Sequence, residues 1–436
     1  MKTGIFWFTL LSFFVLSIQC ILAQQSFSPE SMQNAANYSA GMGGTSTLIM
    51  QNGNLVFEEY HNGADSLTVT HLHSATKGFW SILAAQALET GLFQSYDEVV
   101  ANTITEWQNP TLHPGKSQIT IRHLLQLSSG LSQDVSQIQG LNPATANIYQ
   151  YVTDSLNLNS FPGSTFQYGP SHYYVFGVLL ERKLHNFGIN MNPLQYLDSI
   201  IFQPIGFEYD SWAHDSTGNP HIPNGCFTTS RNWIKYGKLL LQYGNWNGIQ
   251  LVDSTLVQDL FIADGPNHGH AKFLWANNLN GQGSTPSQIA PPGSAGGFMY
   301  YNGYTEIIGL LGAGKNRMYI IPSLNAVILR QTLLESDNFI DNDFLSILLE
   351  GLVSGIENKA HYSSLAIFPN PANNNIFILS ELTNKPFTVQ ILNANGAIIL
   401  NGYNQNTIDV SNLPNGLYFI QIQVKNEKLT QKFIKN

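Results

Sequence analysis

The sequence contains His73-Ser74-Ala75-Thr76-Lys77 immediately before Gly78–Leu88, a run rich in alanine and leucine. Such a run predicts a buried helix. Ser74 and Lys77 are three residues apart and therefore lie on one side of that helix, about one turn from each other. Ser74 then falls near the helix N-terminus, where free N–H groups and the helix dipole favour a developing negative charge.

These two residues have the chemistry of a nucleophile and its base. A lysine in an apolar setting loses proton affinity, so it can accept the serine proton. The pattern Ser-x-x-Lys occurs once in the chain, at Ser74. An ordinary N-cap serine followed by a solvated lysine would give the same pattern, so the other motifs have to decide between the two interpretations.

The composition indicates a packed globular protein. The chain has 436 residues, of which 43% are hydrophobic and 12% aromatic, enough for a large core and more than one domain. Only 11% are charged, and the formal net charge is −9. An acidic chain without a basic run before its last residues argues against nucleic acid as a partner.

The N-terminus has the features of a secretion signal. Lys2 precedes an apolar run from Ile5 to Ile18, and Ala23 ends a plausible cleavage site. We therefore predict a signal peptide over residues 1–23; a retained membrane anchor is the alternative, but the run is short for a span. A lipoprotein signal at Cys20 is disfavoured because Gln19 is too large for such a site.

After that cleavage Cys226 is the remaining cysteine, so the mature chain has no internal disulfide. We expect Cys226 to be a small buried side chain rather than a nucleophile.

Turn and periodicity signals divide the chain into parts. We predict a linker over 24–38, a main domain over 39–353, a second linker over 354–364 and a small all-β domain over 365–436. In the main domain, Asn52-Gly53 between two apolar runs predicts a hairpin, and a short strand is expected over 67–72. Helices are expected over 120–130, 173–182, 233–243 and 339–352, and strands over 305–311, 317–322 and 326–331.

Three motifs of the main domain follow one another: Ser74-x-x-Lys77, Tyr168-Gly169-Pro170 and Gly312-Ala313-Gly314. With the hairpin before the serine, they resemble the serine β-lactamase-like family, which includes penicillin-binding-protein-like carboxypeptidases, esterases and nylon-oligomer hydrolases. The resemblance covers residues 39–340. It implies an α+β fold: a β-lactamase/transpeptidase-like antiparallel sheet packed by helices plus a helical subdomain, here followed by the small β-sandwich.

The resemblance also implies roles for individual residues. Ser74 would form an acyl-enzyme with an ester or amide carbonyl, Lys77 would accept the serine proton, and Tyr168 would relay it to the leaving group. The backbone N–H groups of Ser74 and Lys315, the latter directly after Gly312-x-Gly314, would form the oxyanion hole. Neither a cofactor nor a metal is implied.

Two departures from the family pattern bear on the substrate. The position two residues after Tyr168 usually carries a polar side chain that binds the substrate amide, and here it is Pro170. The last motif usually carries a cation and a hydroxyl that hold a carboxylate, and here it is Gly312-Ala313-Gly314. These changes favour an esterase or small-amide hydrolase over a β-lactamase or a D-alanyl-D-alanine carboxypeptidase. A surface position is expected for His172.

Three alternatives stand beside this interpretation of the main domain. A metal site at His71-x-His73 is disfavoured because a zinc site needs three or four converging ligands. No Gly-x-Ser-x-Gly pattern occurs, which disfavours an α/β-hydrolase. A catalytically silent binding protein on the same scaffold is the alternative outside the enzyme class.

The C-terminal part gives a second resemblance. Phe368-Pro369-Asn370-Pro371-Ala372, Asn393-x-x-Gly396 and Leu413-Pro414-x-Gly416-Leu417-Tyr418 resemble the sorting domain of the type IX secretion system. A carbohydrate-binding sandwich is the alternative, but the aromatic residues are dispersed. This second resemblance implies export through the periplasm to the cell surface or the medium, with the outer-membrane secretion machinery as a partner. The first resemblance implies a small ester or amide as substrate.

Overall fold

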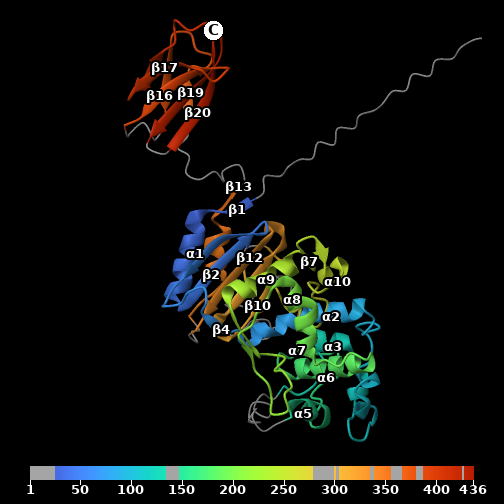
Figure 1. The fold of residues 1–436 in the computed structure, drawn as a ribbon. Helices are drawn as coiled ribbons and strands as arrows, with labels where there is room; N and C mark the ends of the chain where they lie inside the picture. The colour runs from blue at the N-terminus through green and yellow to red at the C-terminus, as the bar shows by residue number, and fades with distance from the viewer. Residues whose placement is uncertain are drawn as a thin grey trace, which may run out of the picture. The chain divides into compact units, whose positions relative to one another are not determined.

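A computed structural model describes residues 25–133, 147–277, 299–300, 304–333, 338–354, 366–379, 386–424 and 427–436. The chain divides into two compact units, Met1–Ser354 and Gly355–Asn436 (Figure 1). The predicted signal peptide and most of the predicted second linker lie outside the described residues.

A six-stranded antiparallel sheet forms the centre of the main unit in the described residues. Its order is β3-β2-β12-β11-β10-β9. The strands span β2 (Gly44–Gln51), β3 (Asn54–Tyr60), β9 (Trp275–Ala276), β10 (Ile308–Leu311), β11 (Arg317–Ile321) and β12 (Ala326–Thr332). The predicted hairpin is confirmed: Asn52 and Gly53 both have positive φ, 54° and 77°, as a two-residue hairpin turn requires.

Helices cover both faces of this sheet. On β12, Ile328 packs with α1 (Pro29–Gly41) and α12 (Asp341–Leu349), while its neighbours Val327 and Leu329 face the core shared with α9 (Ser230–Leu241). This alternation follows from the two-residue period of a strand. Figure 1 shows α1 and α9 on opposite sides of the sheet.

The predicted linker over 24–38 is wrong. Residues Gln25–Phe27 form β1, and α1 begins directly after the N-cap Ser28, whose hydroxyl accepts from the Ser31 N–H. The helix buries Met32, Ala35 and Ala36 at helical spacing. The helix predicted over 339–352 ends at Leu349, because Leu352–Ser354 form β13 and pair with β1.

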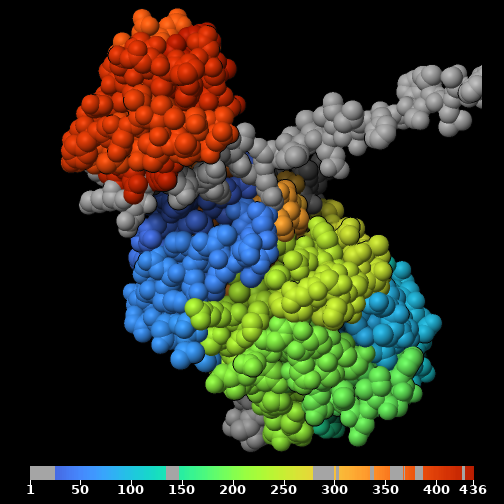
Figure 2. All heavy atoms as spheres, turned by 45° about the horizontal axis from the view of Figure 1, so that its top comes forward, coloured from blue at the N-terminus to red at the C-terminus, as the bar shows by residue number. Residues whose placement is uncertain are grey.

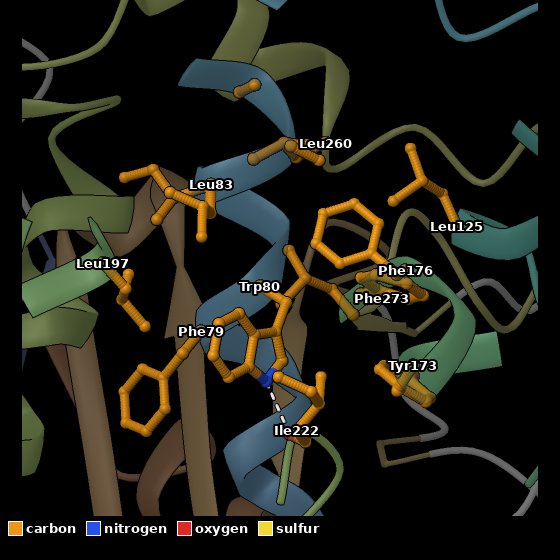
Figure 3. Close-up of a cluster of buried hydrophobic side chains, with 14 of the residues drawn as sticks. Phe79, Trp80, Leu83, Leu125, Tyr173, Phe176, Leu197, Ile222, Leu260 and Phe273 are labelled. Carbon is orange, nitrogen blue, oxygen red and sulfur yellow. Dashed lines mark hydrogen bonds between the residues drawn. The ribbon is translucent and has the colours of Figure 1, made fainter. Parts of the chain in front are cut away.

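The helical part of the main unit is built around α2, the helix predicted after Lys77. Its helices are α2 (Phe79–Glu89), α3 (Ile121–Leu125), α5 (Ile148–Asp154), α6 (Ser171–Asn186), α7 (Pro193–Leu197), α8 (Gln203–Ile205) and α10 (Ser254–Asp259), with η2 (Val100–Asn102), η3 (Thr105–Gln108) and η4 (Lys116–Gln118) as 3₁₀ turns and the π-helical η5 (Asp198–Phe202) between α7 and α8. Phe79 to Ala87 of α2 are buried. Figure 3 shows Phe79, Trp80 and Leu83 among side chains of the surrounding helices, with the Trp80 indole donating to the Ile222 carbonyl.

Smaller elements complete this unit. β4 (Val69–His71), β5 (Ser211–Trp212) and β6 (Cys226–Thr229) form a three-stranded sheet in the order β4-β6-β5, and β7 (Asn245–Trp246) pairs with β8 (Ile249–Gln250). Cys226 is fully buried, as expected. The helix expected over 120–130 is shorter than predicted and ends at Leu125, since Leu127 has a positive φ of 52°. Figure 2 shows the green and yellow middle segments of the chain gathered on one side of the unit and the blue N-terminal segment on the other.

The C-terminal unit is all-β in its described residues. One sheet has the order β14-β15-β18 and the other β17-β16-β19-β20. The strands span β14 (Ala366–Phe368), β15 (Asn375–Leu379), β16 (Thr388–Asn393), β17 (Ile398–Tyr403), β18 (Thr407–Asp409), β19 (Gly416–Val424) and β20 (Glu427–Lys435). Side chains from both sheets, including Ile376 and Ile420, share one core.

Within the described part of the chain, none of the helices combines the length and the apolar character that crossing a membrane would require.

Gly237 tests the packing of α9 on the sheet. A Cβ at this position would lie 2.6 Å from a Val327 methyl and 2.7 Å from the Met318 sulfur. Overpacking of this kind costs about 1–3 kcal/mol, so we expect Gly237→Ala to lower the free energy of unfolding by that amount. Chemical denaturation followed by tryptophan fluorescence measures it for the main unit, because residues 355–436 contain no tryptophan.

Gly41→Ala is the matched control, since a Cβ there meets nothing within 4 Å. Equal free energies of unfolding for the two variants would contradict the tight contact at Gly237.

Candidate active site

Ser74 and Lys77 lie on a tight 3₁₀ turn, η1 (His73–Gly78), that joins β4 to α2. The regular helix predicted for this stretch is wrong, because His73–Gly78 form a 3₁₀ helix. A 3₁₀ helix has three residues per turn, so side chains at i and i+3 are aligned. The Lys77 Nζ accordingly lies 2.9 Å from the Ser74 Oγ. His73, directly before the serine, has a φ of 50°, a strained value for a residue with a side chain.

The Lys77 amine is buried among uncharged groups. Only 7% of the residue is exposed, and its Nζ donates to the Pro223 carbonyl at 3.0 Å. It also lies 5.4 Å from the centre of the Tyr173 ring. Burial lowers the pKa of Lys77 from 10.5 to about 7. The amine can therefore lose its proton near neutral pH and accept one from the Ser74 hydroxyl.

Tyr168 completes the group. The residue is 40% exposed; burial raises the pKa of Tyr168 to about 12, and the nearby Ser74 side chain offsets part of that rise. Its ring lies 5.3 Å from the Lys77 Nζ and 5.4 Å from the Trp275 ring. The phenol thus stays protonated at neutral pH and can donate a proton.

The turn around Gly312 packs directly against the nucleophile segment. A Cβ on Gly312 would lie 2.2 Å from the Leu72 carbonyl oxygen and 3.2 Å from the Ala75 nitrogen, so only glycine fits. Gly314 and Lys315 follow with positive φ values of 67° and 68°. Lys315 is buried, and its carbonyl accepts from the Arg330 guanidinium. Gly312 is the residue of this turn that contacts the nucleophile segment. The role of the Lys315 N–H as an oxyanion donor stays a prediction.

The structure places two residues that follow Tyr168, Pro170 and His172, at the start of α6. Pro170 is the N-cap of α6 and makes no side-chain capping bond. His172 was expected at the surface, and this is wrong: it is fully buried, with both ring nitrogens hydrogen-bonded. It faces the loop that carries Tyr168 because it lies on the buried side of α6, together with Tyr173 and Phe176.

The histidine pair before the serine is packed into the protein. The His71 and His73 rings are 3.9 Å apart, His71 stacks on Phe227, and its Nε2 contacts the Asn224 carbonyl at 2.6 Å. Burial lowers the pKa of His73 to about 4, with the charges of His71 and Lys77 adding to the effect. These rings stiffen the strained approach to Ser74.

A cavity of about 700 Å³ lies elsewhere in the main unit. It is lined by the segments 112–118 and 154–164, which contain none of Ser74, Lys77 and Tyr168. The geometry of the three side chains, and not this cavity, therefore marks the candidate site.

Two parts of the chain match models of known families. Residues 31–221 match the family described as Beta-lactamase, and residues 366–436 match the one described as Secretion system C-terminal sorting domain. The chain carries a β-lactamase-family domain and a secretion-sorting domain. Both resemblances stated from the sequence are thereby confirmed, as is the fold class.

Solved structures share the fold of the β-lactamase-family domain at low sequence identity. A candidate 6-aminohexanoate-dimer hydrolase from Bacillus anthracis is 19% identical, with a TM-score of 0.55 over 72% of this chain and 79% of that chain. A penicillin-binding protein homologue from Caulobacter crescentus is 13% identical, with a TM-score of 0.56 over 75% of this chain and 98% of that chain. EstCE1, a hydrolase with promiscuous acyltransferase activity, is 14% identical, with a TM-score of 0.54 over 74% of this chain and 99% of that chain. The comparison with curated proteins found no match.

Sequence reasoning missed two contributors to the site. The Pro223 carbonyl, which holds the Lys77 amine, comes from a loop 146 residues further along the chain. Ser129 bonds His172 across 43 residues. Pro223 belongs to no motif, and no signal in the sequence linked Ser129 to His172, because the fold alone brings the two segments together.

Proposed function

We propose that the β-lactamase-family domain hydrolyses esters or small amides through an acyl-enzyme on Ser74. The observation that supports this proposal is the contact between the Ser74 hydroxyl and a lysine amine whose pKa burial lowers to about 7. A solvated surface lysine would keep its proton at neutral pH, so this burial has a chemical consequence.

In the first half of the proposed reaction, the Ser74 Oγ attacks the substrate carbonyl carbon while Lys77 takes the serine proton. In this proposal the oxyanion that forms is stabilised by two N–H groups, those of Ser74 and Lys315. The intermediate collapses when the bond to the leaving group breaks. Tyr168, protonated at neutral pH, gives its proton to the leaving alcohol or amine and is reprotonated from Lys77.

In the second half, water replaces the leaving group. Lys77, again a free amine, takes one proton from the water, and the hydroxide adds to the acyl carbon. As the Ser74 ester bond breaks, Tyr168 gives its proton to the Ser74 Oγ and is reprotonated from Lys77. The products are a carboxylic acid and the regenerated serine. Of the groups used in these steps, the Lys77 amine lies 2.9 Å from the Ser74 Oγ.

The substrate class follows from what the usual anchor positions lack. Pro170 offers no side-chain donor for a substrate amide, and Gly312-Ala313-Gly314 offers neither a cation nor a hydroxyl for a carboxylate. These features favour neutral esters or small amides over β-lactams and peptidoglycan peptides. The alternative of a binding protein without turnover is tested directly by the first experiment below.

Ser74→Ala should abolish turnover. We expect labelling of the wild type by a fluorophosphonate probe, hydrolysis of p-nitrophenyl butyrate, and a fall in kcat of at least about 10³-fold in the variant, since a lost nucleophile cannot be replaced by its base. Ser95→Ala, at an exposed serine, is the control. A wild type that neither labels nor turns over would favour the silent binding protein, and rapid hydrolysis of nitrocefin would favour the β-lactamase.

The pH profile should report the lysine. Because Lys77 must be unprotonated to act as a base, kcat/KM should rise with pH through a midpoint of about 7. Tyr168 has a pKa of about 12 and should cause no decline below about pH 11. A midpoint near the ordinary lysine pKa of 10.5 would show that the buried amine is not the base.

The sorting domain indicates export by the type IX secretion system to the cell surface or the medium. We propose that the domain acts only in export and not in catalysis. Deleting residues 355–436 should therefore leave ester hydrolysis by the purified main unit within about two-fold, because independent units contribute additively. It should retain the protein inside cells that possess the secretion system. Loss of hydrolysis together with loss of soluble protein would show that the main unit needs the sorting domain to fold.

A further inference from the structure

Tyr168 lies in a segment without regular secondary structure. Residues 165–170 belong to neither a helix nor a strand and end where α6 begins. A residue that must donate a proton at a fixed place cannot sit on a loose loop, because a displacement of about 1 Å can cost about 10²-fold in rate. Something other than secondary structure must fix this segment.

His172 bonds the segment directly. Its Nε2 lies 2.9 Å from the carbonyl oxygen of Gln167, the residue before Tyr168, and its Nδ1 lies 2.9 Å from the Ser129 Oγ. A carbonyl can only accept, so the Nε2 carries the hydrogen and the Nδ1 accepts from the Ser129 hydroxyl. The ring is fully buried, and burial lowers the pKa of His172 to about 4, which keeps this tautomer neutral.

The partners of His172 are themselves fixed. The Leu131 N–H donates to the Ser129 Oγ at 3.2 Å, and the Gln167 N–H donates to the Leu127 carbonyl at 2.9 Å. Gln167, the residue before Tyr168, is thus held at its carbonyl by His172 and at its N–H by the Leu127 carbonyl.

A second anchor lies just beyond Tyr168. The Gln133 amide oxygen accepts from the Ser171 N–H at 3.0 Å, and the Ser171 hydroxyl donates to the Ser132 carbonyl at 2.6 Å. Ser171 is fully buried. The backbone on both sides of Tyr168 is therefore bonded to one continuous segment, 127–133.

We propose that His172 is a positioning residue that holds the Tyr168 hydroxyl at the Ser74 Oγ by bonding the Gln167 carbonyl to Ser129. This rests on the function proposed above. His172 touches neither Ser74 nor Lys77 in the described contacts, so it acts through Tyr168 and takes no proton itself. A polar ring is needed here because a carbonyl and a hydroxyl must be bridged across the space that one imidazole fills.

Three variants test the chemistry of the bridge. His172→Leu removes both bonds and should lower kcat for p-nitrophenyl butyrate by about 10–10²-fold, the scale of a misplaced catalytic group, with KM changed by less than about two-fold. His172→Gln keeps one acceptor and one donor on a flat amide and should recover part of that loss. His185→Leu, the same change at an exposed position of α6, is the control and should leave both constants unchanged.

A double-mutant cycle with Tyr168→Phe separates positioning from general stability. If His172 acts through the Tyr168 hydroxyl, His172→Leu should lower kcat little further once that hydroxyl is gone, so the two effects are not additive. A merely structural role predicts that the losses multiply, and that result overturns the proposal. Equal kcat for His172→Leu and the wild type also overturns it.

Folding is checked by thermal unfolding of each variant. Should His172→Leu not fold, Ser129→Ala takes its place in the same cycle, because it removes the donor to the Nδ1 while leaving the ring. A wild type without Ser74-dependent turnover refutes the proposed function and this inference together. Ser74-dependent turnover with an additive cycle refutes the inference alone.

Discussion

The burial of the Lys77 amine is the constraint on which the site depends. A charged ammonium in an apolar environment is costly, so the group either finds an anion or releases its proton. Here its described partners are the Ser74 hydroxyl and the Pro223 carbonyl, both uncharged. Burial thereby keeps a substantial fraction of this amine unprotonated near neutral pH, next to the Ser74 hydroxyl.

The surrounding fold serves to keep this amine dry and in place. α2 follows the 3₁₀ turn directly and is buried along almost its whole length. This burial fixes one end of the turn. β4 fixes it at the other end by pairing with β6, and the Gly312 backbone closes against the Leu72 carbonyl. Replacing any of these contacts would admit water or move the turn, and either change raises the pKa of the lysine toward its ordinary value.

What the sequence could predict follows from how local each interaction is. The Asn52-Gly53 hairpin and the Ser74–Lys77 pair depend on residues a few positions apart, and both were predicted. The Pro223 carbonyl and the Ser129–His172 bond depend on segments brought together only by the fold, and both were missed. α1 was mistaken for a linker because most of its residues are polar or small, so its narrow apolar stripe gives a weak periodic signal.

The protonation states around Ser74 also bear on the substrate. Above about pH 7 Lys77 is a neutral amine, Tyr168 keeps its proton, and burial leaves His73 and His172 neutral. The guanidinium of Arg317, whose charge reaches Tyr168, is already paired with Asp341 and with the Gly312 carbonyl. None of these groups offers a free charge to a substrate carboxylate.

A neutral acyl group loses little hydration on entering such a site, whereas a carboxylate would have to give up water without a partner to replace it. The electrostatics therefore support the same substrate class as the missing side chains at Pro170 and Ala313.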